Sequence, residues 1–142
     1  MNPTERNDAI DGYLAAAGWL VSWDDARPED NDTGHEGDHR DGPFTEAAYG
    51  HAATAVDQFA NIAGSDDVRA YLATRLAHCG YPAGWSAAEG LGHDLWLTRN
   101  GHGAGFWDRG LGHLGERLSD AARSLGEATS YVLADGTVEV DG

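Results

Sequence analysis

The sequence predicts an α+β fold, in which N-terminal helices pack with a small mixed sheet built from two β-hairpins joined by a helix. Apolar residues recur at helical spacing through the first half of the chain. Near the end, an Asn-Gly and an Asp-Gly dipeptide each separate two short β-rich runs, and a further helical pattern lies between these dipeptides. A chain of 142 residues supports one hydrophobic core, so we expect a single domain over residues 1–142.

The first helix is expected to begin at Asn2. Asn2 is a favourable N-cap, Pro3 suits the first helical position, and Glu5 completes a capping box. Apolar residues then recur every three or four positions and predict one buried face: Ile10, Tyr13, Leu14, Ala17, Leu20 and Val21.

Two further helices are predicted in the middle of the chain. The second begins at Thr45 and stops at Gly64, and the third is capped by Ser65 and ended by Gly80 and Pro82. Their apolar positions are Ala48, Ala52, Ala55, Phe59 and Ile62 in the second helix, and Val68, Leu72, Leu76 and Cys79 in the third.

Residues 24–42, between the first and second helices, are predicted to form an exposed acidic loop. They are almost wholly polar and show neither a helical nor a strand period. The sequence His35-Glu36-Gly37-Asp38-His39 matches the H-E-x-x-H zinc pattern, but the neighbouring glycines and Pro43 oppose the helix that this chemistry requires. We therefore expect no metal site and no cofactor.

Residues 93–142 are predicted to form a hairpin, a helix and a second hairpin. Ser86 and Glu89 make a capping box, which predicts one or two helical turns before the first hairpin. The turn of that hairpin is expected at Asn100-Gly101. The following helix is marked by Leu111, Leu114, Leu118, Ala121, Ala122 and Leu125, and the second hairpin by runs at 128–133 and 137–140 around Asp135-Gly136.

The first hairpin is the candidate ligand-binding site. Alternation along its strands would place Trp96, Trp107 and Arg109 on one face, with Arg99 and His102 at the tip. Such a face could stack a nucleobase and hold a phosphate. The residues assigned to ligand binding are Trp96, Arg99, His102, Trp107, Asp108 and Arg109.

Two other interpretations of this segment remain open. One or both tryptophans could lie beneath the following helix, and Arg109 could pair with Asp94 or Asp108. Alternatively, His102 with Asp108 or Asp94 could form an acid–base pair in a small hydrolase. No complete catalytic motif is present, so we assign no catalytic residue and favour binding over catalysis, with enzymatic activity left open.

The charge of the chain favours a cationic protein as the partner. The formal net charge is −15, and all nine basic residues are arginine. A surface this negative repels nucleic-acid phosphates and anionic lipid, so neither direct DNA binding nor membrane binding is expected. The same composition also suits a high-GC genome or a salt-adapted host.

The remaining features of the sequence point to the cytoplasm. Cys79 is the only cysteine, so no internal disulfide can form. The polar N-terminus is not typical of a signal peptide, and no apolar run approaches the roughly 20 residues needed to cross a bilayer.

A resemblance to known proteins begins at Gly92. It rests on the segment GHDLWLTRNGHGAGFWDRGLGHLGERL and on the short strand, Asp-Gly and second short strand that follow it. This last third of the chain resembles small uncharacterised proteins of tailed bacteriophages. The resemblance implies a phage or prophage origin, with the cytoplasm of the host cell as the site of action, and no particular activity.

We therefore expect a non-enzymatic phage accessory protein that binds a host component, with anti-defence as its role. The favoured mechanism is an acidic mimic that engages a host protein with a cationic surface. The alternatives are a protein that sequesters a nucleotide or nucleotide signal through the first hairpin, a small hydrolase, and a phage structural or assembly protein. The oligomeric state is not predicted.

Overall fold

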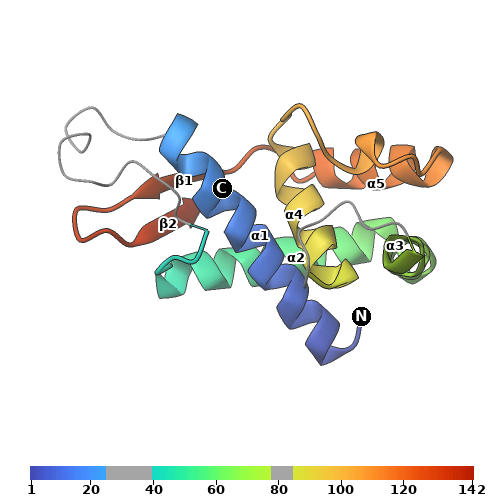
Figure 1. Ribbon diagram of the computed structural model, residues 1–142, viewed down its shortest axis with the longest axis horizontal. Coiled ribbons are helices and arrows are strands. Elements are labelled where there is room, and N and C mark those ends of the chain that lie inside the picture. The colour runs from blue at the N-terminus through green and yellow to red at the C-terminus, as the bar shows by residue number, and fades with distance from the viewer. Residues whose placement is uncertain (25–39, 78–84) are drawn as a thin grey trace.

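The computed structural model describes residues 1–24, 40–77 and 85–142 (Figure 1). It confirms the α+β class, with one hairpin in place of two. Most of the predicted acidic loop, the His35–His39 motif and Cys79 lie outside the described residues. The elements are α1 (Pro3–Asp24), α2 (Glu46–Ala63), α3 (Ser65–Ala77), α4 (Ala87–Arg99), the 3₁₀ helix η2 (Phe106–Asp108), α5 (His113–Arg123), β1 (Thr129–Val132) and β2 (Val138–Asp141).

The predicted caps of the first two helices are confirmed. At the start of α1, the Asn2 side chain accepts a hydrogen bond from the Glu5 N–H at 2.8 Å, and the Glu5 carboxylate accepts one from the Asn2 N–H at 3.0 Å. The Thr45 hydroxyl caps α2 by accepting from the Ala48 N–H at 3.0 Å, and Gly64, with φ +91°, ends it. These helix ends depend on hydrogen bonds between residues only a few positions apart, which the sequence shows directly.

The prediction of a hairpin at residues 93–110 is wrong. The helix that starts at the capping box of Ser86 and Glu89 continues for 13 residues and occupies the expected first strand. The expected second strand is a loop followed by η2. A two-residue turn at Asn100-Gly101 would have placed Leu95 opposite Phe106; no such strand pairing forms, although both side chains are buried.

The dipeptide Asn100-Gly101 ends α4 instead of joining two strands. The Gly101 N–H donates to the Thr98 carbonyl at 3.2 Å, and the His102 N–H donates to the Leu97 carbonyl at 3.0 Å. This pair of bonds is the Schellman motif, with Gly101 (φ +69°) in the left-handed conformation that the motif requires. A primed hairpin turn needs the same positive φ, so the dipeptide alone does not distinguish a helix end from a hairpin turn.

Helix α4 lies at the centre of the fold and packs against α1, α2, α3 and α5. Ten of its 13 residues are buried, including two that carry charge, Asp94 and Arg99. A helix enclosed on nearly every side needs no polar stripe, which explains why its sequence lacks an amphipathic helical pattern.

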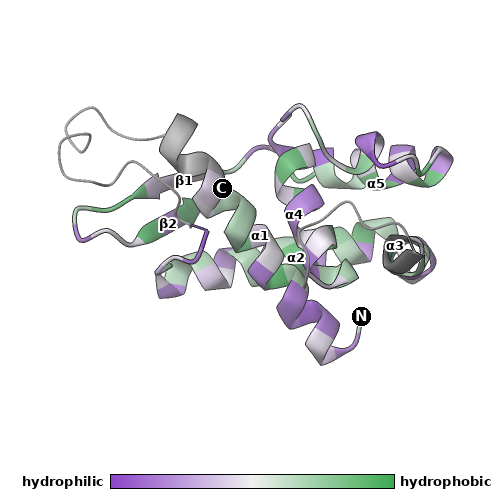
Figure 2. Ribbon diagram, in the orientation of Figure 1, coloured by the Kyte–Doolittle hydropathy of each residue, from purple (hydrophilic) through white to green (hydrophobic). Residues whose placement is uncertain are grey.

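Two glycines allow α1 and α4 to cross closely. A Cβ added at Gly12 of α1 would overlap the backbone carbonyl of Glu89, and one added at Gly92 of α4 would overlap the backbone carbonyl of Ala9. Figure 2 shows the hydrophilic first turns of α1 giving way to the more apolar middle that meets α4. The crossing therefore depends on the absence of a side chain at both positions.

The second predicted hairpin is confirmed as the antiparallel pair β1 and β2, whose turn contains Gly136 at φ +88°. Val138 pairs with Val132, and both side chains are buried. The predicted four-stranded mixed sheet is wrong because the first hairpin is absent. A single parallel bridge between Phe44 and Val138 extends the two-stranded sheet instead.

Within the described residues, no helix is both long enough and apolar enough to span a membrane.

Candidate functional site

The residues predicted to bind a ligand do not share one face. Trp96 is only 2% exposed and lies edge-on to Tyr13, with ring centroids 5.2 Å apart. Arg99 is only 5% exposed. Because these two residues lie on a helix, strand alternation does not bring them together with Trp107 and Arg109, and the predicted stacking face is wrong.

The Arg99 guanidinium binds the end of α5. Its Nε donates to the Gly126 carbonyl at 2.7 Å and its Nη2 to the Leu125 carbonyl at 3.0 Å. The third bond runs from Nη1 to the Tyr13 hydroxyl oxygen at 2.9 Å. Carbonyls that follow a helix lie at the negative end of its dipole, so they stabilise the buried cation. Arg99 therefore has a structural role that joins α1, α4 and α5.

Arg109 pairs with Asp94, as one of the open interpretations predicted. The guanidinium makes a two-point contact, with Nη2 at 2.8 Å and Nε at 3.1 Å from Asp94 Oδ1. Asp94 is fully buried, and the Tyr71 hydroxyl donates to its other oxygen at 2.8 Å. This network holds the loop after α4 against α3 and α4.

The other three predicted residues keep some exposed surface. Trp107 is 49% exposed and Asp108 is exposed, both in η2, while His102 is partly buried. A role for them in ligand binding stays a prediction, without the two arginines that were expected to hold a phosphate.

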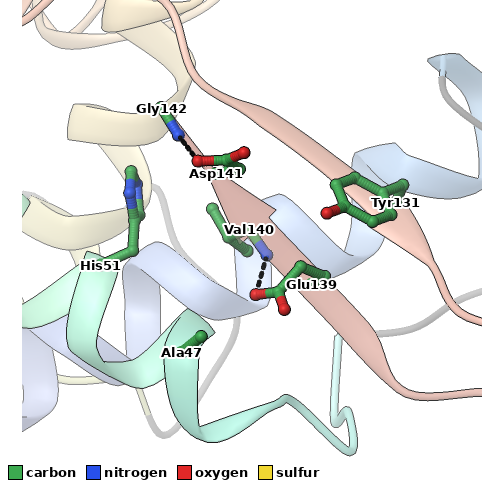
Figure 3. Close-up of a pocket in the computed structure, with 7 residues that line it drawn as sticks. All are labelled: Ala47, His51, Tyr131, Glu139, Val140, Asp141 and Gly142. Carbon is green, nitrogen blue, oxygen red and sulfur yellow. Dashed lines mark hydrogen bonds between the residues drawn. The ribbon is translucent and has the colours of Figure 1, made fainter.

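The structure forms a cavity that the sequence did not predict, between the start of α2 and the outer edge of β2 (Figure 3). We call it the α2–β2 cavity; its volume is about 350 Å³. It is lined by Ala47, His51, Tyr131, Glu139, Val140, Asp141 and Gly142. The nearest sequence signal is the strand alternation that places Glu139 and Asp141 on one face.

The acidic wall of the cavity follows from the register of the sheet. Tyr131 lies directly opposite Glu139 in the antiparallel pair, so their side chains share the outer face with Asp141. Figure 3 shows the two carboxylates on either side of Val140. The Val140 side chain itself is buried on the opposite face.

The cavity opens where the segment before α2 stops pairing with the outer edge of β2. At Val138 the edge is paired: its N–H donates to the Pro43 carbonyl at 2.8 Å, and its carbonyl accepts from Thr45 N–H at 3.0 Å. The chain then turns into α2 and leaves the edge. Two residues later, the Val140 N–H bonds only to the Glu139 carboxylate, at 3.1 Å, and no described donor contacts the Val140 carbonyl on this edge.

Glu139 is positioned by two donors on one oxygen. The Thr45 hydroxyl donates to Oε1 at 2.8 Å, and the Val140 N–H contacts the same atom. Oε2 accepts no hydrogen bond from the described residues. Asp141 likewise uses one oxygen, which accepts from the Gly142 N–H at 2.9 Å. Each carboxylate thus keeps an acceptor for a ligand.

A buried chain of hydrogen bonds orients His51 in the cavity wall. The Tyr13 oxygen accepts from Arg99 Nη1 at 2.9 Å, and it shares with His51 Nε2 a hydrogen bond of 2.7 Å that either the imidazole N–H or the phenol proton can supply. Burial raises the pKa of Tyr13 to about 12, so the phenol keeps its proton. The pKa of His51 is lowered, which favours the neutral imidazole. Burial, followed by the charge of Arg99, lowers the pKa of His51, while Asp141 and Glu139 oppose that shift.

The carboxylates of the cavity suit an organic cation. No three histidine, cysteine, aspartate or glutamate side chains converge as a metal site in the described part of the chain. Carboxylate oxygens with free acceptor capacity, beside an aromatic ring, are the groups that bind ammonium or guanidinium.

No protein-family model, curated protein or solved structure matches this chain.

Proposed function

We propose that this protein is an acidic binding protein that engages a cationic surface of another protein. In line with the bacteriophage resemblance of its last third, we propose a phage accessory protein whose partner is a host protein and whose role is anti-defence. The binding proposal rests on the arginines: most of them form contacts within the fold.

Three arginines make two-point ion pairs across the helices. Arg6 binds Asp57 at 2.8 Å, Arg69 binds Glu5 at 2.9 Å and Arg117 binds Asp67 at 2.9 Å. Together with Arg99 and Arg109, at least five of the nine arginines in the chain have internal partners. Because acidic residues number 24, most carboxylates have no arginine to neutralise them.

Neighbouring carboxylates repel one another at the start of α1 and α4. Burial raises the pKa of Asp11, and the charges of Asp8 and Glu89 raise it further. A cationic partner would relieve this repulsion, which supports binding by charge complementarity.

The same contacts weaken the case for nucleotide sequestration. Arg99 and Arg109 were the groups expected to bind phosphate, and their guanidinium donors already bond to carbonyls, a hydroxyl and a carboxylate. Releasing either one would leave polar groups of the core without partners, which is costly.

Titration calorimetry with a blocked, arginine-rich peptide tests the proposal. We expect binding that weakens strongly between about 0.01 and about 0.15 M salt, because the Debye length falls across this range. The control peptide has citrulline in place of every arginine, which keeps the shape and removes the charge. Equal binding of the two peptides, or no binding of the arginine peptide at low salt, would contradict the proposal.

A further inference from the structure

We propose that the α2–β2 cavity receives an arginine side chain of the cationic partner. This inference deepens the proposed function and rests on it. It places the recognition of a single basic residue at one site. The alternative is nonspecific electrostatic attraction over the whole acidic surface.

The size of the cavity suits one side chain. Its volume of about 350 Å³ lies near the lower end of the range for ligand pockets, roughly 300 to 1,000 Å³. The walls come from three elements with fixed backbones: the first turns of α2 and the paired strands β1 and β2. A site on such elements is largely formed before its ligand arrives, which reduces the entropic cost of binding.

The acceptors match the donors of a guanidinium group. Glu139 Oε2, the Val140 carbonyl and the second oxygen of Asp141 belong to three successive residues on one strand edge. They differ in direction, since the Val140 carbonyl lies in the plane of the sheet and the two carboxylates stand on its outer face. Guanidinium presents five donors in a planar fork, whereas the lysine ammonium presents three on a compact centre.

Two further residues support this choice of ligand. Tyr131, directly across from Glu139, places an aromatic side chain in the cavity wall, and guanidinium groups favour aromatic neighbours. No arginine of residues 1–24, 40–77 or 85–142 lines the cavity. A neutral His51 adds no positive charge that would repel the ligand.

His51 also supplies an internal reporter of binding. Glu139 and Asp141 favour the protonated form of its ring. A bound guanidinium would cancel that effect, so the pKa of His51 should fall when an arginine occupies the cavity. By the same linkage, protonation of His51 should weaken binding as the pH decreases.

The test compares two double variants with the wild-type protein, using the arginine-rich peptide and its citrulline control. In E139Q/D141N the cavity loses both charges, and the amide introduced by E139Q keeps a carbonyl oxygen for the Thr45 hydroxyl. In the matched variant D120N/E127Q, two exposed carboxylates elsewhere are neutralised, so the net charge changes equally. We expect E139Q/D141N to weaken peptide binding about 10-fold or more, and D120N/E127Q to change it less than about 2-fold.

The result that overturns the cavity assignment is an equal loss of affinity in the two variants, with a salt-sensitive wild-type interaction still present. That result leaves the acidic binder standing and rejects the specific site. If the wild-type protein binds no arginine peptide, the proposed function and this inference both fail. As a second readout, NMR titration of His51 should show its pKa lowered by peptide in the wild type and unmoved by peptide in E139Q/D141N.

Discussion

Residues 93–110 and the α2–β2 cavity differ in how their polar groups are used. The first region concentrates tryptophan, arginine and histidine, yet Asp94 and Arg99 are buried and bonded inside the fold. The cavity is built from residues that form no motif, yet its carboxylates keep oxygens that no described residue contacts. The two regions therefore differ in unmet hydrogen-bonding capacity, and this difference is the reason for placing the candidate site at the cavity.

The internal bonding of residues 93–110 extends to an uncharged residue. The Thr98 hydroxyl accepts from the Phe106 N–H at 3.0 Å, and a Cβ at Gly105 would overlap the same hydroxyl. These contacts fold the loop after α4 back onto the helix. Residues 93–110 therefore contribute to the centre of the fold.

The largest expected effect follows from breaking the buried ion pair. D94N removes the charge that compensates Arg109 and should lower the free energy of unfolding by about 3 to 5 kcal/mol, measured by urea denaturation. The matched control is D67N, which breaks the exposed pair with Arg117 and should have a much smaller effect, since water and salt screen it. Equal losses of unfolding free energy in D94N and D67N would show that burial does not strengthen the role of the Asp94–Arg109 pair.

The second effect is a dependence of stability on pH that comes from His93. Burial lowers the pKa of His93 from 6.5 to about 4. Between these values the unfolded chain binds a proton that the folded protein does not, so stability falls as the pH drops from about 7 to about 4. This group should contribute a loss of about 3 kcal/mol.

H93Q should flatten that part of the curve, followed as urea midpoints at a series of pH values. H113Q, at an exposed histidine, should leave the curve unchanged. A wild-type slope that survives in H93Q would place the responsible group elsewhere.

The smallest of the three effects on folding concerns the crossing of α1 and α4. G92A should destabilise the protein by about 1 to 3 kcal/mol, because the added methyl group overlaps the Ala9 carbonyl and the helices must separate. G50A is the matched control: Gly50 lies within α2, with open space around an added Cβ. The control should stabilise the protein by up to about 1 kcal/mol. Effects of the same sign in thermal denaturation would contradict the close crossing.

Local signals predicted much of the fold. The caps at Asn2, Thr45 and Ser86 and the turn at Asp135-Gly136 depend on neighbours within a few residues, and the structure confirms them. Asn100-Gly101 misled the prediction because a hairpin turn and a helix end both need a residue with positive φ. Burial of α4 on all sides, a tertiary property, decided between them.

The candidate site was less accessible to sequence reasoning. For Arg109, the sequence left two carboxylate partners open, Asp94 and Asp108, and the structure selects Asp94. The α2–β2 cavity joins His51 to Glu139 and Asp141, which lie far apart in the sequence, and its acceptors depend on where the strand edge ends. No spacing rule connects such residues.

Mapping ligand contacts by NMR tests the central claim most directly, because it monitors both regions in one experiment. The uniformly labelled protein is titrated with the arginine-rich peptide and, separately, with a nucleoside diphosphate. The account predicts that the peptide shifts amides at residues 47–51, 131 and 139–142, and that the nucleotide shifts none at residues 96–109. Shifts concentrated at residues 96–109 with either ligand would contradict it and restore that segment as the binding site.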